Sequence, residues 1–138
     1  MTLPIQPTAQ TVTDRFGDLV QSVTEAGLRW VDSPDVLDLA EVPPGTVLLL
    51  RDTIDQSSLF ITNEITLTLD CVLQVAGGRR AARAAVHALS ERIREDRSLG
   101  GYVRHVIITQ STATVVEDDP RMGIADLSVV IQYEGLGA

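Results

Sequence analysis

The sequence predicts an α+β fold, a mostly antiparallel sheet with two main helices packed on one face. Three observations lead to this class. Two long segments alternate between apolar and polar residues, an Ala- and Arg-rich segment between them has the period of a helix, and an amphipathic helical segment lies near the N-terminus. We expect the element order α-β-β-β-α-β-β in one domain, residues 11–138, preceded by an extended arm, residues 1–10.

The segment 64–97 organises the rest of the chain. Its first part places six apolar side chains on one side of an extended chain: Ile65, Leu67, Leu69, Cys71, Leu73 and Val75. Gly77-Gly78 ends this half-buried strand, because two residues without Cβ favour a turn. From Arg79 an apolar stripe recurs at helical spacing: Ala82, Ala85, Val86, Leu89 and Ile93. This helix is apolar on one side only, so we expect it to lie on the sheet.

A basic stripe lies about a quarter-turn away on the same helix. It contains Arg79, Arg83, His87, Ser90, Arg94 and Arg97. Two interpretations are open: a solvated helix face, which is the commoner case, or a docking face for acidic protein or phosphate. The chain has a net charge of −8, and residues 1–75 hold three Arg against 11 carboxylates, whereas residues 76–138 hold eight of each. An acidic chain with one basic stripe is a poor candidate for gripping nucleic acid, because that affinity comes chiefly from neutralised phosphates.

The N-terminal part predicts one amphipathic helix and a short apolar segment. The apolar positions of this helix are Val12, Phe16, Leu19, Val20, Val23 and Ala26. Thr11 with Asp14 resembles a capping pair, and Gly27 is placed to end the helix. Trp30 suits a core anchor or, less commonly, a binding platform. Ser33-Pro34-Asp35 predicts a short helical turn over residues 34–40.

A buried strand and an irregular segment precede the central unit. Thr46 to Leu50 is an apolar run of strand length that follows a Pro-Pro-Gly turn. Arg51 to Asn63 has no clean period and predicts either a long exposed loop or an extended hairpin. It holds a short apolar cluster, Leu59, Phe60 and Ile61. Such a cluster is a common mark of an interaction site, although the start of an ordinary strand explains it equally well.

The C-terminal part predicts strands only. Residues 98–101 end the helix, Tyr102 to Thr109 is β-branched enough for a strand, and Thr112 to Val116 continues or pairs with it. A turn cluster at residues 117–123 leads into a final alternating strand. Its inward residues are Ala125, Leu127, Val129, Ile131 and Tyr133.

The sequence offers no constellation for catalysis, and we expect neither enzyme activity nor a cofactor. His87 and His105 have no metal-ligand spacing around them, and the acidic pairs Asp52/Asp55 and Asp118/Asp119 do not match a calcium loop. Gly77 to Arg80 lacks the spacing of a phosphate loop. Cys71 suits a small core residue, and the N-terminus has no signal-peptide pattern, so we expect a soluble protein.

Several stretches together resemble the tail terminator (tail completion) proteins of long-tailed bacteriophages and related phage-like particles. The stretches are the first amphipathic helix, the turn and strand Val42 to Leu49, the alternating strand Glu64 to Val75 with its Gly-Gly-Arg-Arg helix entry, Arg94 to Val106, and the acidic turn before the last strand. The resemblance covers roughly Thr11 to Tyr133. It lies in element order and local sequence and includes no catalytic motif.

The resemblance implies a homo-oligomeric ring, usually a hexamer, that stops polymerisation of the tail tube at the head-tail junction of a virion. Its partners would be other copies of itself, the tail tube protein and the head-tail connector protein, and genome DNA would pass through without specific binding. We predict that Arg79, Arg83, Arg94 and Arg97 contact acidic protein, and that Leu59, Phe60 and Ile61 become shielded on assembly. Two alternatives stay open: another neck protein of the same particle, and a ferredoxin-like small-molecule-binding regulatory domain.

Overall fold

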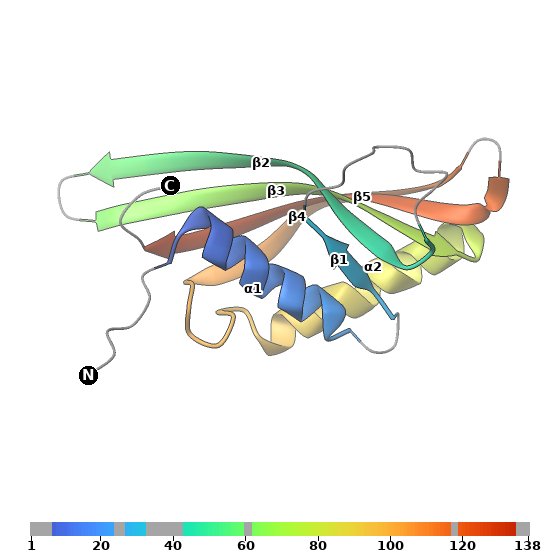
Figure 1. The fold of residues 1–138 in the computed structure, drawn as a ribbon, viewed down its shortest axis with the longest axis horizontal. Helices are drawn as coiled ribbons and strands as arrows, with labels where there is room; N and C mark the ends of the chain where they lie inside the picture. Colours follow the sequence, from blue (N-terminus) through green and yellow to red (C-terminus); the bar gives the residue numbers. More distant parts are fainter. Residues whose placement is uncertain (1–6, 24–26, 33–42, 60–61, 117–118, 135–138) are drawn as a thin grey trace.

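The structure, a computed structural model, describes residues 7–23, 27–32, 43–59, 62–116 and 119–134 (Figure 1). Two helices and five strands follow one another in the predicted order: α1 (Ala9–Gln21), β1 (Arg29–Val31), β2 (Thr46–Leu59), β3 (Thr62–Ala76), α2 (Gly78–Glu95), β4 (His105–Val116) and β5 (Asp119–Glu134). The strands form one sheet in the order β1-β2-β3-β5-β4. Every neighbouring pair is antiparallel except β1 with β2. The α+β class is confirmed.

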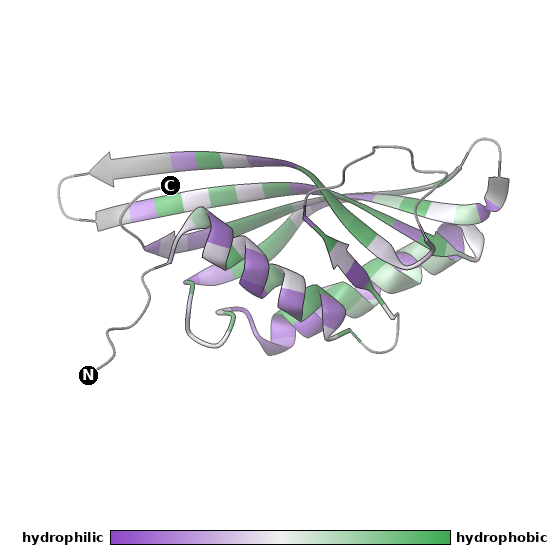
Figure 2. Cartoon of the chain, viewed as in Figure 1, coloured by the Kyte–Doolittle hydropathy of each residue, from purple (hydrophilic) through white to green (hydrophobic). Residues whose placement is uncertain are grey.

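Both helices lie on the same face of the sheet, and the described residues place no helix on the other (Figure 1). We call the uncovered side the helix-free face. The helix α2 crosses β3, β4 and β5, whereas α1 contacts β1 and α2. Alternation along β3 explains this arrangement, because Ile65, Leu67, Leu69, Cys71 and Leu73 are buried under the helices. Figure 2 shows hydrophobic and hydrophilic residues alternating along this strand.

The segment after Leu50 forms an extended hairpin, and the loop interpretation of residues 51–63 is wrong. Strand β2 pairs with β3 without a long gap, from Thr46 opposite Gln74 to Leu59 opposite Thr62. A bulge at Leu50 shifts the register by one residue. It also reverses the face of the strand, because side chains of directly paired residues share a face. Val47 and Leu49 before the bulge face the helices, and Asp52 and Ile54 do so after it.

Helix α1 starts earlier than the sequence predicts. Thr8 is the N-cap: its side-chain oxygen accepts from the Thr11 N–H at 3.2 Å, and the Thr11 hydroxyl accepts from the Thr8 N–H at 2.9 Å. The predicted Thr11/Asp14 capping pair is therefore wrong, because Thr11 is the third helical residue. The expected extended arm loses its last two residues to the helix, which ends at Gln21 and thus well before Gly27.

Helix α2 and the strand that follows it differ from the prediction at one junction. The helix ends at Glu95 rather than Arg97, and the next strand begins at His105 rather than Tyr102. Leu99, Gly100 and Gly101 have φ angles of 50°, 74° and 85°, and this run of left-handed residues delays the strand. The strand β4 then continues through a bulge between Ile108 and Gln110, so the two predicted β-segments are one strand.

The core lies between the sheet and the helices. All five predicted inward residues of β5 are buried, as are Ala82, Ala85, Leu89 and Ile93 of α2, whereas Val86 is partly buried. Trp30 packs edge-on against Phe16, with ring centroids 5.5 Å apart, which fits a core anchor. Further predictions lie outside the described residues: the arm over residues 1–6, Ala26 of the first helix, the helical turn at 34–40, Phe60 and Ile61. No helix of the described chain is long and apolar enough to cross a membrane.

Candidate protein-interaction surfaces

The basic stripe of α2 runs beside the edge strand β4. Two shallow pockets form where the helix meets the strand. One, of about 350 Å³, lies between Arg94 and Arg97 of the helix and residues 105–108 of the strand. The other, of about 250 Å³, lies between Arg83 and His87 and residues 111–113. We call this region, Arg83, His87, Arg94 and Arg97 together with β4, the basic edge.

Most charges of the stripe are exposed and have no ion-pair partner among the described residues. Arg79, Arg83, His87, Arg94 and Arg97 are all exposed. Arg94 pairs with Glu91 on the same helix, with Nη1 2.9 Å from Oε1. Within the part of the chain that the structure describes, no ion pair involves the other four. An exposed pair such as Arg94 with Glu91 contributes only about 0.2–1 kcal/mol, so even that arginine is available to a partner.

Other arginines make contacts within the chain, and the sequence alone could not show which basic residues do so. Arg15 lies over the Tyr102 ring, with its guanidinium carbon 4.0 Å from the ring centroid. Arg92 donates from Nε to Ser22 Oγ at 3.0 Å and so ties α2 to α1. Arg104 lies 3.4 Å from the Glu64 carboxylate. These contacts join residues far apart in sequence, 70 positions for Arg92 and 40 for Arg104, which no local pattern reveals.

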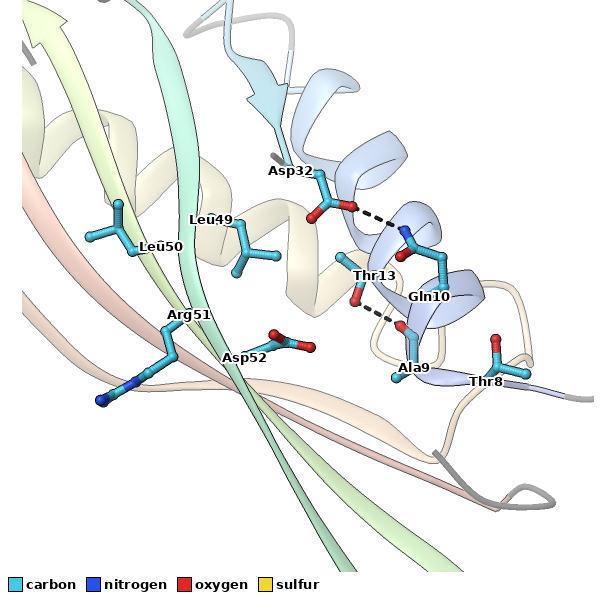
Figure 3. Close-up of a pocket in the computed structure, with 9 residues that line it drawn as sticks. All are labelled: Thr8, Ala9, Gln10, Thr13, Asp32, Leu49, Leu50, Arg51 and Asp52. Carbon is cyan, nitrogen blue, oxygen red and sulfur yellow. Dashed lines mark hydrogen bonds between the residues drawn. The ribbon is translucent and has the colours of Figure 1, made fainter. Parts of the chain in front are cut away.

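An acidic groove flanks the opposite edge of the sheet, between β2 and the start of α1 (Figure 3). It has a volume of about 470 Å³ and is lined by Thr8, Ala9, Gln10, Thr13, Asp32, Leu49, Leu50, Arg51 and Asp52. Gln10 donates from Nε2 to Asp32 Oδ2 at 3.0 Å and to Asp14 Oδ1 at 2.9 Å. These bonds hold Asp32 against the helix, at the side of the groove.

The two charged residues of β2 at this groove point in opposite directions. In Figure 3 the Asp52 side chain points toward α1, whereas the Arg51 side chain points away from it. On the helix-free face Arg51 donates to Asp70 Oδ2 from Nε and Nη2, at 3.1 and 3.0 Å. The described residues provide no ion-pair partner for Asp52, so its exposed carboxylate gives the groove an uncompensated negative charge.

Exposed apolar side chains gather on the same two strands. Among the described residues the large exposed ones are Leu50 at 48% and Ile54 at 36% of β2, with Ile107 at 51% and Val115 at 38% of β4. The sequence did not predict that these four side chains are exposed. It assigned Leu50 to a buried strand, because the bulge that exposes Leu50 leaves no local signal. Of the predicted cluster, Leu59 ends β2 while Phe60 and Ile61 lie outside the described residues, so that cluster stays a prediction.

The titratable groups that could support chemistry are dispersed. No group of three or more His, Cys, Asp or Glu side chains is arranged around a metal position in the described ranges. Burial, and to a lesser extent the charge of Asp70, raises the pKa of the Cys71 thiol to about 12, so this cysteine is a protonated core residue at neutral pH. His87 and His105 are exposed, and Asp52 and Asp55 lie on a strand rather than a loop.

Comparisons with known proteins show the fold. A chain described as "Virion of native gene transfer agent (GTA) particle" matches with a TM-score of 0.55 and 17% identity, over 84% of each chain. The fimbrial biogenesis protein PilO from Pseudomonas aeruginosa matches with a TM-score of 0.43 and 8% identity, over 94% of this chain and 73% of that one, a similarity too low to support an argument. No protein-family model and no curated protein matches the sequence.

Proposed function

We propose that this chain is a structural virion protein that forms a ring, caps the tail tube, ends its polymerisation and provides the surface for head-tail joining. The observation that carries the proposal is the fold shared with a chain of a phage-like virion over 84% of both chains. The resemblance of the stretches between Thr11 and Tyr133 to tail terminators supports the same role. A fold alone does not determine function, so the proposed capping role depends on interaction surfaces, which here are the two edges of the sheet.

The geometry of a tail explains what such a protein needs. A tube subunit presents a head-to-tail face that repeats indefinitely, so a cap must bind that face and close into a ring of matching symmetry. In this proposal the chain has itself, the tail tube protein and the head-tail connector protein as partners. Genome DNA passes through the ring without specific binding, in keeping with a net charge of −8.

A second candidate is a head-tail connector or another neck protein of the same particle. The virion match favours it equally, because the description of that chain names the particle and not a position within it. The third candidate, a small-molecule-binding regulatory domain, has no observation of its own in its favour. It predicts a dimer that binds a metabolite tightly.

The proposal is tested in particles assembled without this protein. We expect tail tubes of uncontrolled length that do not join heads, measured by electron microscopy of negatively stained lysates. Tubes of normal length that fail to join heads would favour the neck-protein role instead. Normal tails on normal heads would contradict both virion roles.

A further inference from the structure

In the part of the chain that the structure describes, the sheet has two long unpaired edges. Strand β1 pairs with β2 only over Thr46 to Leu48, so among the described residues the stretch 49–59 of β2 has no partner on that side. Strand β4 is the last strand of the sheet, and among the described residues its outer side is free over residues 105–116. The two free stretches are of similar length. Unpaired edges of this kind are templates for pairing with another chain.

The composition of β4 indicates an edge that is meant to be paired. Proteins protect exposed edge strands with charged residues, proline or short length. The sequence of β4, HVIITQSTATVV, contains no Lys, Arg, Asp, Glu or Pro and is rich in β-branched residues. Its exposed Ile107 and Val115 add apolar surface that pairing would cover.

We propose that copies of this chain join edge to edge, with β4 of one copy pairing antiparallel with residues 49–59 of β2 of the next. The junction deepens the proposed function, since it supplies the interface on which a ring of that role would rest. Strand directions allow it: β2 is antiparallel to β3, β3 to β5 and β5 to β4, so β2 and β4 point in opposite directions. A second copy placed beside the first, with its helices on the same side, therefore presents an antiparallel β2 to β4.

Charge selects this pairing over the two symmetric ones. The β4 edge carries the exposed Arg83, His87, Arg94 and Arg97, whereas the β2 edge carries the exposed Asp52 and Asp55 beside the acidic groove. Arg51 of β2 is also exposed, but Asp70 compensates its charge at 3.0 Å. Pairing β4 with β4 would bring the basic edges together, and pairing β2 with β2 would bring the acidic edges together. Like charges placed opposite each other are destabilising, so the head-to-tail junction of β4 with β2 is preferred.

Aligning the midpoint of residues 105–116 of β4 with the midpoint of residues 49–59 of β2 sets the register of the junction and therefore the residues that pair across it. Thr112 then lies opposite Thr53 of the next copy, both on the helix-free face. On the helix-bearing face Ala113 lies opposite Asp52 of the next copy. Because Arg83 lines the pocket at residues 111–113, this register brings Arg83 of one copy to Asp52 of the next.

Charge reversal tests the ion pair. We expect the single variants Arg83→Asp and Asp52→Arg each to weaken self-association by roughly tenfold, because like charges then meet at every junction. The double variant Arg83→Asp/Asp52→Arg should regain association. A 1:1 mixture of the two single variants should regain it too, because every junction in an alternating assembly then joins opposite charges. Self-association is measured by sedimentation velocity of the full chain at concentrations up to about 1 mM.

The matched control moves the reversed arginine along the same edge. Arg97 lies at residues 105–108, away from the expected position of Asp52, so Arg97→Asp combined with Asp52→Arg should not regain association. Two results would contradict the pairing of β4 with β2. One is a double variant Arg83→Asp/Asp52→Arg whose self-association is weakened by the sum of the two single effects. The other is a mixture of the two single variants that does not regain association. Equal rescue by Arg97→Asp would overturn the register.

Cross-linking tests the strand pairing independently of stable association. The double variant Thr53→Cys/Thr112→Cys should give a ladder of covalent oligomers with a bismaleimide of about 10 Å reach. A reagent of this length tolerates an error of about two residues on either side of the expected register. Each single-cysteine variant should give at most a dimer band. A double-cysteine chain that forms no ladder at about 1 mM would contradict the proposal. Tail-length defects in particles without the protein, combined with no ladder, would remove this junction while leaving the ring role in place.

Discussion

Gly123 is a residue at which the sheet and helix α2 approach each other very closely. It is a buried position of β5, and a Cβ added there would collide with the carbonyl oxygen of Gly78, lie 2.6 Å from that carbonyl carbon and lie 3.0 Å from the Ala82 Cβ. The obstacle is the backbone at the first turn of α2, which cannot rotate away as a side chain would. This approach presses the start of α2 onto the sheet and so helps to place the basic edge beside β4.

We predict that Gly123→Ala destabilises the protein by about 1–3 kcal/mol, because the added methyl group forces the helix away from the sheet. The measurement is the free energy of unfolding in urea. Thr114→Ala, at an exposed position of β4 paired with the residue after Gly123, is the control and should change stability by no more than about 0.5 kcal/mol. Equal effects of the two substitutions would show that α2 does not approach the sheet this closely.

Cys71 gives a prediction with a defined pH range. Its pKa rises from 9.0 to about 12 on folding, so the native state binds the thiol proton more tightly than the unfolded chain. The stabilisation is complete below pH 9.0 and is lost as the pH rises toward about 12. Burial raises the pKa of Tyr133 as well, so it acts in the same direction.

We therefore expect the Cys71 thiol to resist a maleimide at about pH 8 in the native protein and to react in denaturant, because only unfolding exposes it. The alkaline loss of stability should be shallower in Cys71→Ala, measured by urea unfolding between about pH 8 and pH 11. Rapid labelling of the native protein under the same conditions would place Cys71 at the surface.

One residue, Leu50, marks the limit of what the local sequence could predict. The alternation along residues 64–75 predicted the buried face of β3 correctly, because each apolar position there follows the last by two. The bulge at Leu50 breaks that rule in β2 and turns Asp52 and Ile54 to the helix-bearing face, where they remain exposed. A bulge depends on the partner strand, so the residues that line the candidate β2 edge could not be read from β2 alone.

Among the helices and strands, α2 has two distinct faces, one that packs in the core and one that is exposed. Its apolar face is buried on β3, β4 and β5, and its basic face runs beside the free edge of β4. The sequence predicted both faces, because each follows the helical period. It could not predict which strand the basic face would lie beside, since that depends on the strand order, in which β5 lies between β3 and β4.

We predict that Arg79→Glu/Arg83→Glu weakens assembly and that salt weakens the remaining assembly less, because the substitutions remove the attractive ion pairs between subunits that salt would screen. Sedimentation velocity across a NaCl series measures both effects. Arg80→Glu, an exposed arginine outside the stripe, is the control and makes half of that change in net charge. Unchanged oligomerisation and tail capping in the double variant would show that the stripe is a solvated helix face.

The hairpin of β2 and β3 carries the second interaction prediction. Leu59 ends β2 and Thr62 begins β3, and Phe60 follows Leu59 outside the described residues. We predict that Phe60→Asp leaves the isolated subunit folded, as measured by circular dichroism, and disrupts assembly, because a charge then enters an apolar contact. Unfolding of the isolated subunit would instead assign Phe60 to the core.

The two edges of the sheet have the features that the proposed head-to-tail pairing requires. One edge of its sheet is basic and the other acidic, both carry exposed apolar residues, and the two edge strands point in opposite directions. A two-fold interface would need one self-complementary patch, whereas these edges complement each other. The element order and class followed from sequence periodicity, but the complementarity of the edges appears only once the strand order places β2 and β4 on opposite sides of the sheet.

The central claim is that this chain forms the ring at the head end of the tail tube, and a single-particle electron microscopy map of intact tails tests it most directly. We predict a closed ring directly above the last tube ring, into which copies of this fold fit with β4 of each beside β2 of the next. The same fold in repeated rings along the tube, in the head or in the baseplate, or nowhere in the particle, would contradict the account.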